Sequence, residues 1–222
     1  MPFFFFIQRY KLMIVAVCGL IGTGKSTLVN KLANNNGYTV FDEPVDNNPF
    51  LVDYYKDPAR WSFTLQVYYL WERYKQAQEA HMRSLKGETV VLDSSLYSDF
   101  AFALLQHNEK YFTDDEYKTY LNMHKIIASQ TAYPELFIWL SITPEQTLER
   151  IKTRSRDCES SIPIEYLRNL YVAYNIVLEK LSKHTTIITV DAQPDADTVY
   201  NNVNKIINNC KETLNENELN YV

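Results

Sequence analysis

The segment CGLIGTGKST, at positions 18 to 27, constrains the fold of this chain more than any other part of the sequence. It matches the pattern GxxxxGK[ST], follows an apolar run typical of a buried strand and precedes a helical pattern. Glycines let backbone N–H groups turn around phosphate oxygens, and the following helix N-terminus favours an anion. We therefore predict that this loop holds the β and γ phosphates of a nucleoside triphosphate. The residues expected to do so are Gly19, Leu20, Ile21, Gly22, Thr23, Gly24, Lys25, Ser26 and Thr27.

Short apolar runs and amphipathic helical patterns alternate along the rest of the chain. Runs that are apolar on both faces are typical of central strands in a parallel sheet, and alternation with helices predicts an α/β fold. We expect a five-stranded parallel sheet with helices on both faces and a ligand at the carboxyl ends of the strands. The strands are expected at 13–18, 38–41, 89–93, 136–141 and 185–190, and the helices at about 24–34, 61–86, 97–107, 114–131, 144–153, 163–182 and 195–210.

Length, charge and cysteine content limit the class of protein. A chain of 222 residues suits one domain, which we place at 13–211, after an N-terminal extension (1–12) and before a polar C-terminal tail (212–222). The net charge of −5 comes from interspersed acidic and basic residues, which argues against a nucleic acid polymer as partner. The same charge pattern favours a small molecule as substrate. Three scattered cysteines favour a reducing, cytoplasmic compartment, and the lack of a long apolar run argues against a membrane-spanning helix.

Acidic residues follow two of the predicted strands. Asp42 and Glu43 come after the second strand, and Asp93 ends the third. Phosphoryl transfer to a hydroxyl needs a carboxylate that takes the proton and another group that holds the metal, and strand ends bring both beside the phosphate loop. The hydroxyl of Ser26 in the loop can also bind Mg²⁺. From position alone, the alternative that these acids only cap turns stays open.

Five segments, read in order and at their spacing, resemble the deoxyribonucleoside kinase family, in particular the bacterial deoxyadenosine and deoxyguanosine kinases. The resemblance extends from Met13 to about Lys183. It implies a P-loop kinase fold with an arginine-rich lid, ATP as phosphate donor, Mg²⁺, a homodimer, and phosphorylation of a deoxyribonucleoside 5′-hydroxyl in nucleotide salvage. The segments are GLIGTGKST, DEPVDNNPFL, YYKDPARWSFTLQVYYLWER, LDSSLYSD and RIKTRSRDCESSIPIEYLRNLYVAY.

The resemblance also implies roles for individual residues. Glu43 matches the general base for the 5′-hydroxyl, and Asp93 matches an acid near the metal, which we place between Asp93 and Ser26. Tyr55 and Glu159 match the pair that holds the sugar 3′-hydroxyl. With Lys25, we expect Glu43 and Asp93 to form the catalytic group, together with arginines of the lid.

Three arginines lie within seven residues before a proline-started helix. Arginine suits the spread charge of a transferring phosphoryl group, and the resemblance matches all three to the lid over the donor phosphates. We expect Arg154 and Arg156 to act in catalysis, and Arg150 and Arg154 to bind the donor. A solvated basic helix end is the alternative interpretation.

One face of the predicted helix at 61–86 carries polar residues at helical spacing, among them Gln66, Tyr69 and Arg73. A side-chain amide offers one donor and one acceptor, which suits the polar edge of a nucleobase, although a surface glutamine is the alternative. By resemblance Gln66 reads the base, and Arg73 and Asp99 form a charged pair beside it that thymidine-preferring members lack. We therefore expect deoxyadenosine first, then deoxyguanosine or deoxycytidine.

The chain departs from the family pattern at Ser94, where the family has arginine after the acid. Serine lacks a positive fork for the phosphoryl group, so we expect the rate to suffer more than binding, unless another arginine, such as Arg73 or Arg83, occupies the vacant place. Two alternative functions stay open: a nucleoside monophosphate kinase such as thymidylate kinase, and a catalytically weakened nucleotide-binding regulator.

Overall fold

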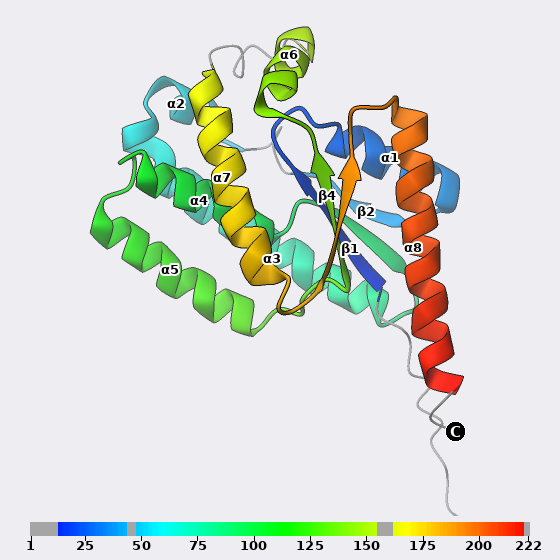
Figure 1. Ribbon diagram of the computed structural model, residues 1–222. Coiled ribbons are helices and arrows are strands. Elements are labelled where there is room, and N and C mark those ends of the chain that lie inside the picture. Colours follow the sequence, from blue (N-terminus) through cyan, green and yellow to red (C-terminus); the bar gives the residue numbers. More distant parts are fainter. Residues whose placement is uncertain (1–12, 44–47, 155–161, 220–222) are drawn as a thin grey trace, which may run out of the picture.

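The computed structural model describes residues 13–43, 48–154 and 162–219, with side chains as far as residue 214 (Figure 1). Arg156 and Glu159 lie outside these residues. The helices and strands are β1 (Met13–Gly19), α1 (Lys25–Asn36), β2 (Thr39–Phe41), α2 (Leu51–Lys56), α3 (Pro58–Ser84), β3 (Thr89–Asp93), α4 (Leu96–Asn108), α5 (Asp114–Ser129), β4 (Leu136–Ser141), α6 (Pro144–Arg154), α7 (Ile164–Leu181), β5 (Thr186–Asp191) and α8 (Ala196–Leu219).

A single five-stranded sheet forms the centre of the described structure. Its strand order is β2-β3-β1-β4-β5 and every neighbouring pair is parallel, which confirms the predicted sheet. β1 lies in the middle, and Val15 pairs with Val91 of β3 on one side and with Leu136 of β4 on the other. Because the chain crosses over at β1, the carboxyl ends of β1, β3 and β4 frame a crevice at one edge of the sheet, where ligands bind in such folds.

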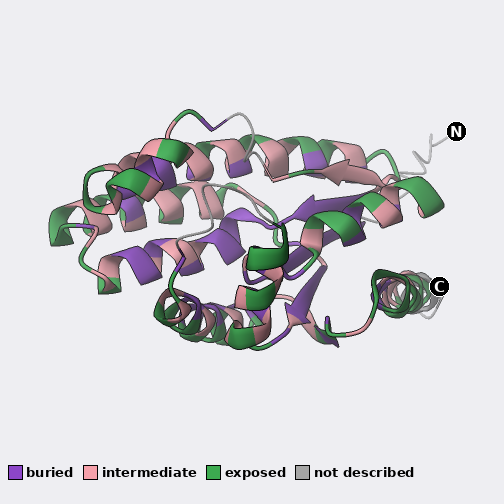
Figure 2. Cartoon of the chain, turned by 90° about the horizontal axis from the view of Figure 1, so that it is seen from above, coloured by how far each residue is buried: buried purple, intermediate pink, exposed green. Residues whose placement is uncertain are grey.

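Helices cover both faces of the sheet, as predicted (Figure 1). Alternate residues of β1 point to opposite faces: Val15 and Val17 pack toward α1 and α8, whereas Ala16 and Cys18 pack toward α4 and α7. This period of two, with apolar residues in both registers, explains why the strand reads as one continuous apolar run. The three central strands β1, β3 and β4 are accordingly almost entirely buried (Figure 2).

Several elements differ from those predicted. The short helix α2 was not predicted, and α3 begins at Pro58 because the Asp57 side chain accepts a hydrogen bond from the Arg60 N–H at 3.2 Å and caps the helix. The last helix continues to Leu219, and Leu214 still packs against the core. Within the described residues, no helix combines the length and apolar character that crossing a bilayer requires.

Candidate active site

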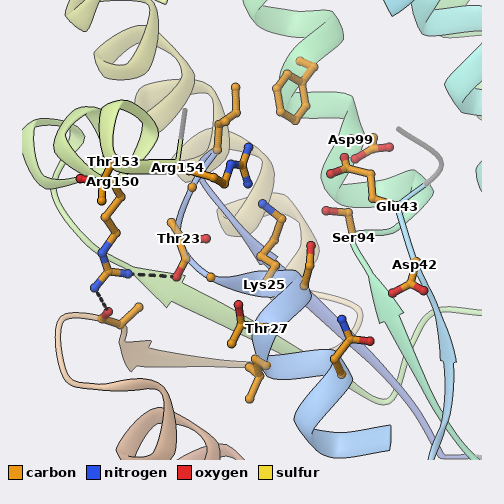
Figure 3. A pocket seen from close by; sticks show the side chains of 18 of the residues that line it. Thr23, Lys25, Thr27, Asp42, Glu43, Ser94, Asp99, Arg150, Thr153 and Arg154 are labelled. Carbon is orange, nitrogen blue, oxygen red and sulfur yellow. Dashed lines mark hydrogen bonds between the residues drawn. The ribbon is translucent and has the colours of Figure 1, made fainter. Parts of the chain in front are cut away.

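A cavity of about 890 Å³ opens at the carboxyl edge of the sheet. Its wall is formed by the loops after β1, β2, β3 and β5, by the first turns of α1 and α8, and by helices α2, α3, α4, α6 and α7. Figure 3 shows side chains from these segments pointing toward one space. The volume falls in the range that accommodates small-molecule ligands.

The loop between β1 and α1 has the conformation that phosphate binding requires. Gly24 precedes α1 with φ 95°, a left-handed conformation that favours glycine. At Gly19 a Cβ atom would lie 2.8 Å from Thr23 Oγ1 and 2.9 Å from the Leu140 carbonyl oxygen, so a larger residue would displace the loop. Lys25 Nζ donates to the carbonyl oxygens of Gly19 at 3.2 Å and Leu20 at 3.1 Å. The loop thus curls around a lysine that faces the cavity.

Asp93, at the end of β3, lies directly behind the phosphate loop. Ser26 Oγ donates to Asp93 Oδ2 at 2.8 Å, and Asp93 Oδ1 is buried with no hydrogen-bond partner in the described part of the chain. Burial raises the pKa of the Asp93 carboxyl, and the nearby Lys25 ammonium opposes that shift. A buried carboxylate with a free oxygen beside a loop hydroxyl fits a divalent cation.

The described residues contain no cluster of three or more histidine, cysteine or acidic side chains that could hold a metal by themselves. Ser26 and Asp93 would offer a cation one hydroxyl and one carboxylate, and Mg²⁺ is commonly bound by one or two carboxylates together with water and substrate phosphates.

Glu43 and Asp99 lie together on the far side of the cavity from Arg150, and Arg73 binds both (Figure 3). Arg73 Nη2 lies 3.2 Å from Glu43 Oε1, and Arg73 Nε lies 2.6 Å from Asp99 Oδ2. Burial raises the pKa of Asp99, and the Arg73 charge opposes this. Burial alone would lower the pKa of Arg73, but Asp99 and Glu43 raise it overall, so the guanidinium stays charged.

The neighbouring carboxylate of Asp42 lines the cavity but points away from Glu43 in the close-up (Figure 3). Its backbone carbonyl accepts a hydrogen bond from Gln76 Nε2 at 2.8 Å. Of the two acids after β2, only Glu43 contacts Arg73. Glu43 is therefore the better placed of the two for proton transfer.

The predicted acceptor region also lines the cavity. Gln66 is 3% exposed and lies with Tyr69 on α3, facing the cavity beside Asp99. Tyr55 of α2 lines the same wall, and its predicted partner Glu159 lies outside the described residues. By contrast, Arg73, predicted as a substrate contact, is 1% exposed and does not line the cavity. It lies behind the two carboxylates that do.

The two described lid arginines differ in their contacts. Arg154 extends from α6 into the cavity that Lys25 also faces (Figure 3). Arg150 donates to the backbone carbonyls of Thr23 at 3.2 Å, Ala192 at 2.6 Å and Gln193 at 3.3 Å. Arg150 therefore joins α6 to the phosphate loop and to the loop after β5.

Comparison with known proteins agrees with this geometry. The family model described as "Deoxynucleoside kinase" matches residues 15–215. The chain belongs to the deoxynucleoside kinase family. It is 37% identical over 177 residues to a deoxyadenosine kinase of Dictyostelium discoideum, with coverage of 80% of this chain and 71% of that protein. It is 34% identical over 164 residues to a deoxyadenosine/deoxycytidine kinase of Bacillus subtilis, covering 72% and 74% of the two chains.

A solved deoxyadenosine kinase from M. mycoides, described with the products dCMP and dCDP bound, has the same fold. The TM-score is 0.80 at 28% sequence identity, with 89% of this chain and 100% of that chain covered. These matches confirm the family and the P-loop kinase fold that the sequence motifs implied. A deoxynucleoside kinase is a transferase, so the protein is an enzyme.

The structure also shows where Ser94 lies in this deoxynucleoside kinase, and where the two arginines considered as substitutes for the family's arginine lie. Ser94 is 2% exposed, has φ 66°, and donates its N–H to the Val17 carbonyl at 2.9 Å. Arg83 lies at the far end of α3 and pairs with Glu79 and Glu88. Arg73, by contrast, contacts Glu43.

Two parts of the cavity wall were not predicted. Gln106 Nε2 donates to Tyr54 Oη at 3.3 Å, and the Tyr54 and Tyr166 hydroxyls lie 3.5 Å apart, so α2, α4 and α7 meet in a polar cluster. The loop after β5 contributes residues 192–195. The rule that identified Asp42 and Glu43, namely that residues after a parallel strand face the ligand, also applies to this loop.

Proposed function

We propose that the protein transfers the γ-phosphoryl group of ATP to the 5′-hydroxyl of a deoxyribonucleoside, with deoxyadenosine preferred. The observation that carries this proposal is one cavity with two differently built ends. The phosphate loop, Lys25 and Arg154 line one end, and Glu43, Gln66 and Asp99 line the other. A donor phosphate and an acceptor hydroxyl can therefore meet between Lys25 and Glu43.

Each residue has a chemical task in this proposal. Glu43 takes the proton of the 5′-hydroxyl as the oxygen attacks, and Lys25 and Arg154 balance the charge on the phosphoryl oxygens, together with Arg156 by resemblance. Mg²⁺, when bound, supplies charge neutralisation on the β and γ phosphates. Ser26, which lines the cavity, and Asp93, whose carboxylate accepts a hydrogen bond from Ser26, would hold it.

The acceptor end suits a neutral nucleoside better than a monophosphate. The cationic side chains among the described lining residues are Lys25, Arg150 and Arg154, from the phosphate loop and α6. The lining residues of α2, α3 and α4 are apolar, aromatic, amide or acidic. An acceptor phosphate there would lack a positive partner, which argues against a nucleoside monophosphate kinase. The arrangement of Lys25, Ser26 and Glu43 likewise argues against a regulator without activity.

The charges near Gln66 favour a base that carries an amino group. Asp99 lines the cavity, and its Oδ1 is buried without a hydrogen-bond partner among the described residues. An exocyclic amino group of adenine, guanine or cytosine could donate to this oxygen, whereas thymine offers a carbonyl at the corresponding edge.

We expect kcat/KM to be at least about tenfold higher for deoxyadenosine than for thymidine, because an unpaired buried carboxylate oxygen costs on the order of 1–3 kcal/mol. Deoxyguanosine and deoxycytidine should fall between the two. Steady-state kinetics with each deoxynucleoside and ATP test this order. A kcat/KM that is highest for thymidine would contradict the assignment of the acceptor site.

We further propose the homodimer that the family resemblance implies. Val172 and Ile176, one helical turn apart on α7, are large apolar side chains that stay exposed in the single chain, which supports an interface on this helix.

A further inference from the structure

We infer that Arg73 is a positioning residue that holds the carboxylate of Glu43 in place for proton transfer. Arg73 thereby supplies a positive charge that Ser94, which stands where the family has arginine, does not. The inference rests on the proposed function, because it assigns a task to Arg73 through Glu43. The observation that prompts it is that Arg73 contacts both cavity-lining acids without lining the cavity itself.

The guanidinium of Arg73 is held at every nitrogen. Besides the contacts to Glu43 and Asp99, Nη1 donates to the Asp93 carbonyl oxygen at 2.7 Å and to Gln76 Oε1 at 3.2 Å. Four hydrogen bonds use four of the five N–H groups that an arginine offers. The three bonds to Asp99, Asp93 and Gln76 fix the guanidinium, which therefore presents Nη2 to Glu43 in one orientation.

Glu43 itself has little other support in the described part of the chain. β2 is only three residues long and ends at Phe41, so Asp42 and Glu43 follow the strand as irregular chain. Two contacts from α3 hold this stretch: Gln76 binds the Asp42 carbonyl, and Arg73 binds the Glu43 side chain. Arg73 and Gln76 are three residues apart on one helix face, so α3 acts as a brace for the end of β2. Glu43 keeps 28% of its side chain exposed toward the cavity.

Ser94 adjoins the same cation. Ser94 and Arg73 line one small cavity behind the main one, and Arg73 binds the carbonyl of Asp93, the residue before Ser94. An arginine at position 94 would bring a second guanidinium close to Arg73. Each nearby acid already has a partner on one carboxylate oxygen, Asp99 Oδ2 with Arg73 and Asp93 Oδ2 with Ser26, and the proposed function assigns their other oxygens to the base and the metal. The effect of Ser94→Arg should therefore depend on whether Arg73 is present.

The test measures kcat and KM in four proteins: wild type, Ser94→Arg, Arg73→Met with Asp99→Ala, and the triple variant. Asp99 is changed together with Arg73, because a buried carboxylate without its partner would destabilise the fold. We expect Arg73→Met/Asp99→Ala to lower kcat about 10²-fold at saturating nucleoside, since a displaced catalytic group costs rate. Adding Ser94→Arg should lower kcat of the wild type but raise kcat of the double variant at least about tenfold.

A matched control is Arg83→Met, on the same helix but in an exposed ion pair with Glu79 and Glu88, which should leave kcat unchanged. If the double variant keeps the wild-type kcat and only its KM rises, the Arg73–Asp99 pair acts on binding alone and the inference fails. It also fails if Ser94→Arg raises kcat of the wild type, a result that needs no Arg73 variant to fold. Wild-type activity on deoxynucleosides tests the proposed function separately.

Discussion

Replacing Glu43 by glutamine should lower kcat about 10²-fold or more, while the KM for the nucleoside changes by less than about threefold. Glutamine keeps the shape of the side chain and its hydrogen bond with Arg73 but removes the proton acceptor. Glu43 contacts Arg73 and lines the cavity, so this change removes the proton acceptor and keeps the side chain in place. Steady-state kinetics on purified Glu43→Gln measure both constants.

Asp42→Asn is the matched control for this prediction. Asp42 is the adjacent acid on the same stretch of chain, and its carboxylate points away from Glu43 (Figure 3). We expect kcat of Asp42→Asn to stay within about threefold of the wild type. Loss of activity in Asp42→Asn with retention in Glu43→Gln would assign the proton to Asp42 instead.

Asp93→Asn should raise the Mg²⁺ concentration required for half-maximal activity about 10- to 100-fold, as expected when a carboxylate that supports a metal is removed. The side-chain oxygen of asparagine can still accept the hydrogen bond from Ser26 Oγ, so the loop keeps its support. Titration of activity with Mg²⁺ at fixed ATP measures the shift. An unchanged Mg²⁺ requirement would remove Asp93 from the metal site.

The stability of Asp93→Asn separates loss of metal from loss of fold. Burial raises the pKa of the Asp93 carboxyl, so its ionised form costs the folded state free energy, and this cost grows as pH rises through the raised pKa. Asparagine carries no charge, so the melting temperature near neutral pH without nucleotide and Mg²⁺ should stay equal or rise. A lower melting temperature would show that the carboxylate supports the fold.

The sheet and the phosphate loop could be predicted because their signals are local. β1 is apolar in both registers, and the loop needs glycine where φ is positive, as at Gly24. Helix α2 escaped prediction because it has six residues, no side-chain cap and an exposed Val52, so it shows no amphipathic period. Helical spacing predicted that Gln66 and Arg73 share one face of α3. It could not predict that Gln66 lines the cavity and Arg73 does not, because spacing shows on which face of a helix a residue lies and not how deeply it is buried.

Hydrogen bonds from side chains to backbone carbonyls could not be predicted from the sequence either. Arg150 was expected to bind the donor, and it lines the cavity, but its described hydrogen bonds go to carbonyls of the phosphate loop and of the loop after β5. Any residue type has a carbonyl, so no pattern marks such partners. The same reason hid the bond between Arg73 and the Asp93 carbonyl, which depends on how α3 packs against β3.

The most direct test of the account is to supply ATP labelled at the γ-phosphate with deoxyadenosine or, separately, with deoxyadenosine monophosphate, and to separate the products. If the protein is a deoxynucleoside 5′-kinase, label appears in the monophosphate formed from deoxyadenosine and depends on Mg²⁺, and the monophosphate as acceptor gives no labelled diphosphate. Label in the diphosphate, with none transferred to deoxyadenosine or to any other deoxynucleoside, would contradict the account.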